Sequence, residues 1–195
     1  MPPDDVLLRA TDRADELGTG APSPGTGAAL ALLAAATRAV AVVEIGTGAG
    51  VAGLWLLSGM RPEGVLTTID LDAENQRAAR EAFTEAGVRP ARVRAITGRP
   101  LDVLPRLADG AYDLVVADGD PLELAAHVEQ ALRILRPGGV LAVVHALVGD
   151  RVPDPARRDE TTTALREVAR RLREDDRVVP ALLPTGDGLL LAARR

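Results

Sequence analysis

Residues 43–50 read Val-Glu-Ile-Gly-Thr-Gly-Ala-Gly, a glycine-rich loop between a short apolar run and a helical stretch. Glycines at positions 46, 48 and 50 let the backbone turn sharply and approach a ligand closely. The first amides of the helix that follows offer an anion-binding end. Asp70 stands 20 positions after Gly50, at the end of the next apolar run, where a carboxylate can reach a ribose diol. The loop therefore predicts a nucleoside-bearing cofactor.

Short apolar runs alternate with helical stretches from this loop outward. Five runs are rich in β-forming residues, and each is apolar enough to be covered on both faces. Alternation of this kind is typical of an α/β protein with a doubly wound parallel sheet. The predicted strands are 41–45, 65–70, 92–97, 112–118 and 139–145, and the predicted helices are 51–60, 73–86, 101–107 and 122–135.

Both ends of the chain add elements to this core. Residues 4–17 show apolar side chains at helical spacing, and a second helix is predicted to follow Pro22 and Pro24 and to end near residue 37. Residues 155–175 predict an Arg-rich helix with a solvated face. Two further strands, 177–183 and 189–193, are joined by a connection too short for a crossover helix, so we expect them to pair antiparallel. The domain prediction is a single domain over 1–195, with a helical cap over 1–37 and a Rossmann-like core over 38–195.

Composition narrows the class of protein. The chain has 195 residues, is 47% hydrophobic and carries a formal net charge of −5. An acidic balance argues against a nucleic-acid partner held by phosphate contacts. The absence of Lys and Cys excludes Schiff-base catalysis and a thiolate nucleophile. The acidic start lacks signal-peptide features, and the most apolar stretch is too short to span a membrane, so we expect a cytoplasmic protein.

The glycine loop alone leaves two cofactors open. Gly48, Gly50 and Gly53 also satisfy the dinucleotide pattern G-x-G-x-x-G, so an NAD(P)-dependent oxidoreductase is an alternative. Glu44 favours a cofactor with positive charge over one with a pyrophosphate, unless this carboxylate only pairs with an Arg or caps a backbone amide. The chain lacks a Tyr and Lys pair of the kind that such oxidoreductases use, because it has no Lys and its only Tyr, Tyr112, lies within a predicted strand.

Four ordered motifs carry a family resemblance. They are V-E-I-G-T-G-A-G at 43–50, T-I-D-L-D at 68–72, Y-D-L-V-V-A-D-G-D at 112–120 and L-R-P-G-G at 135–139. Together they resemble the small bacterial O-methyltransferases related to catechol and caffeoyl-CoA O-methyltransferases, which use S-adenosylmethionine. The resemblance implies a class I methyltransferase fold, with a seven-stranded sheet of order 3-2-1-4-5-7-6, an antiparallel last strand and extra N-terminal helices. It also implies a homodimer that methylates a hydroxyl of a small acceptor.

The resemblance implies a set of cofactor-binding residues. The loop residues would surround the methionine part of the cofactor, the acid and leucine after the second strand would hold ribose and flank adenine, and Arg99 would border the adenine edge. Ala52 stands where relatives often have a Ser that binds the cofactor carboxylate. Asp118 would also lie at the substrate mouth. The implied residues are Pro22, Glu44, Gly46, Thr47, Gly48, Gly50, Ala52, Asp70, Leu71, Arg99 and Asp118.

The match breaks where cation-dependent members carry their ligands. Such members read D-A-D-K after the fourth strand and D-N after the fifth, whereas this chain reads D-G-D-P at 118–121 and V-V-H-A at 143–146. One carboxylate and one imidazole make a poor magnesium site. We therefore expect the family's divalent metal to be lost, the alternative being a softer ion held by Asp118 and His145.

His145 is the candidate base in place of a metal. An imidazole titrates near neutral pH and can accept the proton of a substrate hydroxyl, with Asp118 orienting it. Two alternatives stay open: His145 bonds only to nearby backbone while catalysis rests on positioning, or the protein binds S-adenosylmethionine without catalysing a reaction. His127 is predicted to be a surface or packing residue, and Trp55 a core or subunit-contact residue.

Overall fold

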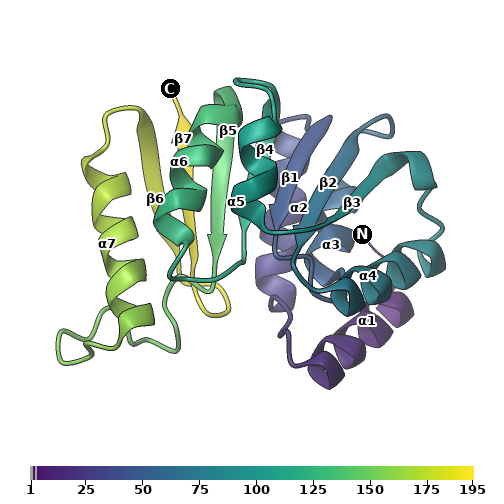
Figure 1. Ribbon diagram of the computed structural model, residues 1–195, viewed down its shortest axis with the longest axis horizontal. Coiled ribbons are helices and arrows are strands. Elements are labelled where there is room, and N and C mark those ends of the chain that lie inside the picture. Colours follow the sequence, from purple (N-terminus) through teal and green to yellow (C-terminus); the bar gives the residue numbers. More distant parts are fainter. Residues whose placement is uncertain (1, 3) are drawn as a thin grey trace.

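The computed structural model describes residues 2 and 4–195, and these residues form a seven-stranded mixed sheet of order β3-β2-β1-β4-β5-β7-β6 (Figure 1). The first five strands pair in parallel, and β7 runs antiparallel to both β5 and β6. The implied strand order and the reversal at the last strand are confirmed. The strands are β1 (Ala41–Ile45), β2 (Val65–Asp70), β3 (Val93–Thr97), β4 (Tyr112–Ala117), β5 (Leu135–Val144), β6 (Val178–Leu183) and β7 (Leu189–Arg194).

Helices cover both faces of the sheet because successive strand residues point to opposite sides. Val42 packs with the helices of one face, and its neighbour Val43 packs with those of the other. Figure 1 shows α2 behind the sheet and α6 in front of it. One face carries α1 (Asp4–Leu17), α2 (Pro24–Ala36), α3 (Val51–Gly59) and α4 (Ala73–Glu85), and the other carries α5 (Pro100–Val103), α6 (Leu124–Ile134) and α7 (Glu160–Glu174).

The two N-terminal helices are attached to the core in different ways. Helix α1 lies on α4, where Arg9 and Arg13 form ion pairs with Glu85. Helix α2 packs closely on α3 at Gly27. A Cβ atom at this position would lie 2.3 Å from the indole nitrogen of Trp55, so a larger residue would not fit. Trp55 is a core residue, as predicted, and only 8% of it is exposed.

Two predicted helices are wrong in their bounds. The predicted helix 101–107 is the short α5 followed by a 3₁₀ turn over Leu104–Arg106, because Pro105 has no backbone N–H to continue the helix. The predicted helix 155–175 begins only at Glu160, where the side chain of Asp159 accepts a hydrogen bond from the backbone N–H of Thr162 and caps the first turn. None of the helices within residues 2 and 4–195 is long and apolar enough to cross a membrane.

Candidate functional site

The carboxyl ends of the parallel strands meet at one edge of the sheet, the lower edge in Figure 1. The loops after β1, β2 and β4 enclose a cavity of about 570 Å³ there, which we call the larger cavity. Most of the predicted cofactor residues line it, and they come from five separate parts of the chain. These residues are Pro22, Gly46, Thr47, Gly48, Ala52, Asp70, Leu71, Arg99 and Asp118.

The glycine loop reaches this cavity by a close backbone crossing. Gly46 has a φ of +88°, and a Cβ atom there would lie 2.3 Å from the carbonyl oxygen of Asp118. Only glycine combines that conformation with that approach. Gly50, in contrast, does not line the cavity, because it caps the start of α3 and faces Ala79 of α4.

Asp70 holds the loop in shape from the end of β2. Its Oδ2 accepts hydrogen bonds from the backbone N–H groups of Thr47 at 2.9 Å and Gly48 at 3.0 Å. Its Oδ1 accepts from the backbone N–H of Asp72, and Asn75 donates to both oxygens. The carboxylate therefore lines the cavity and also braces the loop, a second role that its spacing did not predict.

Glu44 lies beneath the loop and is not among the residues that line the larger cavity. It is completely buried, and its Oε2 accepts a hydrogen bond of 2.5 Å from the hydroxyl of Thr68. A chain of buried donors continues from Thr68 to Thr47 and Gln76. Burial raises the pKa of Glu44 to about 8, the charges of Asp118 and Asp70 add to the shift, and the bond from Thr68 opposes it. Burial therefore favours the neutral form of this side chain.

The charge of the larger cavity is predominantly negative. Four acids line it, and Arg99 is the only basic side chain among the described residues that do so. Arg99 donates to Glu123 at 2.7 Å, which offsets one of the four acids. A cavity of this composition favours a ligand with positive charge and disfavours a pyrophosphate. The four acids are Asp70, Asp118, Asp120 and Glu123.

His127 lines the larger cavity too, and the sequence did not predict it there. It is 1% exposed, so the expectation of a packing residue is confirmed and that of a surface residue is wrong. Neither ring nitrogen has a hydrogen-bond partner within the described part of the chain. Burial lowers the pKa of His127, which favours the neutral ring, although Glu123 and Asp120 oppose the shift. Helical spacing alone gave no signal for this position, because it does not tell whether a buried side chain meets the core or a cavity.

A smaller cavity of about 200 Å³ adjoins the larger one and shares Asp118 and Gly119 with it. His145 lines this smaller cavity, directly after β5. Its Nε2 lies 3.9 Å from Oδ1 of Asp118, and its Nδ1 lies 3.4 Å from Oδ2 of Asp187. The structure therefore brings the predicted pair together and adds a second acid from the turn between β6 and β7.

Asp118 titrates unusually for an acid. Burial raises its pKa to about 6, and the imidazole of His145 opposes this shift. At pH 7 the group is mostly ionised and can stabilise a proton on the neighbouring ring. No set of three or more His, Asp or Glu side chains among residues 2 and 4–195 is placed to hold a metal ion.

The remaining walls of the smaller cavity are largely apolar. They come from β5, from the segments after β4 and β5, and from helices α6 and α7. The described residues that line it include no Phe, Trp or Tyr. A cavity of this size is large enough for one benzene-sized molecule, which fits a cavity of about 150 Å³. Its apolar lining includes Pro121, Leu124, Val143, Val148 and Leu165.

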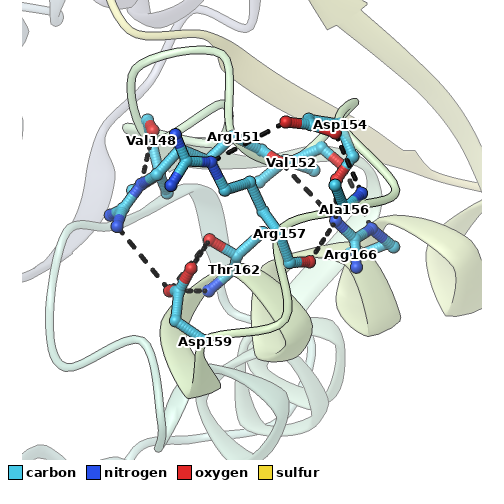
Figure 2. A network of polar contacts seen from close by, with 9 residues as sticks. All are labelled: Val148, Arg151, Val152, Asp154, Ala156, Arg157, Asp159, Thr162 and Arg166. Carbon is cyan, nitrogen blue, oxygen red and sulfur yellow. Dashed lines mark hydrogen bonds and ion pairs between the residues drawn. The ribbon is translucent and has the colours of Figure 1, made fainter.

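The loop over 145–159 is shaped by two arginines (Figure 2). Arg166 of α7 donates to the carbonyl oxygens of Val152 at 3.0 Å and Asp154 at 2.9 Å, and also to that of Arg157. Arg151 donates to the carbonyl oxygen of Val148, which lines the smaller cavity. Arg166 was predicted to lie on a solvated face and instead holds this loop, while other arginines of α7 form the expected ion pairs with acids one turn away.

Comparisons with known proteins agree with this geometry. Residues 7–195 match the model of the family described as O-methyltransferase. A protein of Mycobacterium ulcerans (strain Agy99), whose name assigns it provisionally to the O-methyltransferases, is 54% identical over 191 residues, which cover 98% of this chain and 85% of that protein. A solved structure from Corynebacterium glutamicum is 37% identical, with a TM-score of 0.92 over 100% of this chain and 91% of that chain. An O-methyltransferase of Streptomyces achromogenes, solved in complex with S-adenosylmethionine, is 29% identical, with a TM-score of 0.87 over 98% of this chain and 90% of that chain.

Proposed function

This chain belongs to the O-methyltransferase family, and from that premise we propose that it transfers the methyl group of S-adenosylmethionine to a hydroxyl oxygen of a small acceptor, with His145 as general base. The observation that carries the proposal is the position of Asp118 on the wall that the two cavities share, with His145 of the smaller cavity beside it. The larger cavity is the cofactor site in this proposal, and the smaller one is the acceptor site.

The residues of the larger cavity fit a cationic nucleoside cofactor. S-adenosylmethionine, when bound, supplies an electrophilic methyl group on a positively charged sulfur. The surplus of acids in the lining favours that charge. Asp70 would hold the ribose, Leu71 and Arg99 would border the adenine, and the glycine loop would surround the methionine part, with Pro22 and Ala52 also in the lining. The buried Oε1 of Glu44, beneath the loop, has no hydrogen-bond partner among the described residues, so it is free to form a hydrogen bond.

His145 accepts the proton in this proposal. The acceptor hydroxyl lies against Nε2, the bond from its oxygen to the methyl carbon forms as the carbon–sulfur bond breaks, and the hydroxyl proton passes to Nε2. The products are a methyl ether and S-adenosylhomocysteine. Asp118, 3.9 Å away and mostly ionised at pH 7, stabilises the imidazolium that results.

The proposed reaction proceeds without the divalent cation of related enzymes. Support comes from the side chains at this site: Val144 and Pro121 offer no side-chain oxygen ligand, and the described residues place no set of three or more His, Asp or Glu side chains to hold a metal ion. Hard cations such as magnesium prefer six oxygen ligands. Methyl transfer that is unchanged after chelation of metals is the expected result, and transfer that requires added magnesium would contradict it.

The acceptor, the assembly and the location belong to the same proposal. The volume and apolar walls of the smaller cavity favour a small acceptor with one hydroxyl and little charge. The family resemblance supports a homodimer, and the acidic composition argues against a nucleic-acid partner. A cytoplasmic protein without a membrane partner is the expectation from the sequence. Sedimentation of the purified chain tests the homodimer directly.

The test of the base is the variant His145→Gln. Methyl transfer to a panel of small alcohols and phenols is followed by mass spectrometry of the products. We expect His145→Gln to lower kcat by about 100-fold or more, because a general base contributes on that order. Affinity for S-adenosylhomocysteine should be unchanged. An undiminished rate would remove His145 from the mechanism, and wild-type protein that binds the cofactor but methylates nothing in the panel would favour the inactive binding protein.

A further inference from the structure

His145 has an unusual backbone conformation that the proposed reaction does not by itself explain. Its φ is +55°, in the left-handed region that non-glycine residues rarely adopt. Such a conformation persists only where surrounding contacts impose it, and it occurs often at functional sites. The contacts that impose it here come from the turn between β6 and β7.

That turn is fastened to the segment after β5 by backbone and side-chain bonds. The backbone N–H of Ala146 donates to the carbonyl oxygen of Gly188 at 3.1 Å, and the N–H of Leu147 donates to the carbonyl oxygen of Asp187 at 2.9 Å. Both carboxylate oxygens of Asp187 make contacts. Oδ1 accepts a hydrogen bond from the backbone N–H of Gly149, and Oδ2 lies 3.4 Å from Nδ1 of His145.

The turn itself is fixed against the start of α2. The hydroxyl of Thr26 donates to the carbonyl oxygen of Thr185 at 3.3 Å. A Cβ atom at Gly186 would lie 2.5 Å from the hydroxyl of Ser23, so the two segments approach closely. Asp187 is therefore presented to His145 from a rigid position.

We propose that Asp187 is a positioning residue that keeps the proton of neutral His145 on Nδ1, so that Nε2 faces Asp118 and the acceptor as an open base. This inference rests on the proposed function for its consequence in catalysis. The physical reason is that a carboxylate accepts hydrogen bonds and cannot donate one when ionised, so the nearer ring nitrogen carries the proton. Asp187 is nearer to the ring than Asp118, by the two distances of 3.4 Å and 3.9 Å.

The variant Asp187→Asn separates this role from a structural one. The amide oxygen can still accept the hydrogen bond from Gly149, so the loop keeps its fastening. The amide NH₂ then faces Nδ1 and donates to it, which places the ring proton on Nε2 instead. A ring that already carries its proton on Nε2 cannot accept another proton there from the acceptor. Exchange of Asp for Asn in a Ser-His-Asp triad likewise fixes the wrong tautomer and lowers kcat.

The measurement is the ¹⁵N NMR spectrum of labelled histidine, which reports directly which ring nitrogen is protonated. The chain has two histidines, so a His127→Gln variant assigns both signals. Spectra are recorded at about pH 9, where a free imidazole is neutral. The matched control is Asp176→Asn, which removes the same charge from an exposed position near the end of α7.

We expect His145 to carry its proton on Nδ1 in the wild type and the control, and on Nε2 in Asp187→Asn. The variant should also lose about 100-fold in kcat, with unchanged affinity for S-adenosylhomocysteine. Wild-type protein in which His145 carries its proton on Nε2 would overturn the inference. An unchanged His145 tautomer in Asp187→Asn would overturn it as well. If that variant does not fold, the wild-type spectrum alone decides. A tautomer change without methyl transfer by the wild type would overturn the proposed function and keep the positioning role.

Discussion

Asp70 supports the glycine loop and, in the proposed function, also binds the cofactor. Its Oδ2 accepts from the amides of Thr47 and Gly48, so its removal should loosen the loop as well as delete a ribose ligand. We predict that Asp70→Ala weakens binding of S-adenosylhomocysteine by about 10- to 100-fold, the range expected for lost charge-assisted hydrogen bonds. Calorimetric titration measures this.

The control for that prediction is Asp102→Ala, which removes an acid from an exposed position on α5. Its affinity should equal that of the wild type. If Asp70→Ala bound the ligand as tightly as the control does, the assigned role of Asp70 would be wrong.

Glu44 allows a pH prediction with a definite sign. Its pKa is raised from 4.5 to about 8 in the folded chain, so the folded chain keeps a proton that the unfolded chain releases. This group therefore contributes stability that is fully present below pH 4.5 and is lost as the pH rises toward 8. Glu44→Gln should be less sensitive to pH over that interval, as measured by urea unfolding of the ligand-free protein. An exposed control, Glu16→Gln, should keep the wild-type slope, and an unchanged slope in Glu44→Gln would show that Glu44 is ionised.

Single residues also show where sequence reasoning ended. Asp118 and His145 could be paired from the sequence because both follow parallel strands, whose carboxyl ends share one edge of the sheet. Asp187 could not, because it lies in a turn whose contact depends on how an antiparallel hairpin is placed. The position of His127 was also out of reach, because helical spacing does not tell whether a buried side chain meets core or cavity.

At the scale of elements, α7 holds the wall of the smaller cavity in place. Arg166 donates to several carbonyl oxygens of the loop over 145–159 (Figure 2). A lysine has one ammonium group and cannot reproduce that planar fork. We predict that Arg166→Lys accelerates amide hydrogen exchange in residues 148–157 by about tenfold or more, because local opening becomes easier. Hydrogen exchange with mass spectrometry measures it.

Arg170→Lys is the matched control, because Arg170 lies on the same helix and pairs only with Glu167 and Glu174 among the described residues. Exchange in this loop should be unchanged in the control. Equal exchange in the two variants would contradict the role of Arg166.

The elements themselves were predictable to differing degrees. The bounds of β1 and β2 agree with the prediction because short runs rich in β-branched residues, with Gly or Asp at their ends, mark them clearly. The prediction failed at Pro105, which has no backbone N–H to continue an α-helix. It also failed over 155–159, where tertiary hydrogen bonds from Arg166 hold the loop. The start of β5 was also missed, since Leu135 pairs with Tyr112 across an irregular register.

At the scale of the whole molecule, the order of the seven strands followed from the family resemblance, while alternation alone predicted only a doubly wound sheet. The structure adds the arrangement of charge. Loops from distant parts of the chain place four acids around the larger cavity, and that surplus separates a cationic cofactor from a dinucleotide more clearly than the glycine pattern does.

Calorimetric titration with S-adenosylhomocysteine, beside a titration with NADH and repeated after chelation of metals, is therefore the most direct test of this account. We predict a Kd on the order of 1–10 μM for S-adenosylhomocysteine, unchanged by the chelator, and no measurable binding of NADH. Tight binding of NADH without binding of S-adenosylhomocysteine would contradict the assigned cofactor and with it the proposed reaction.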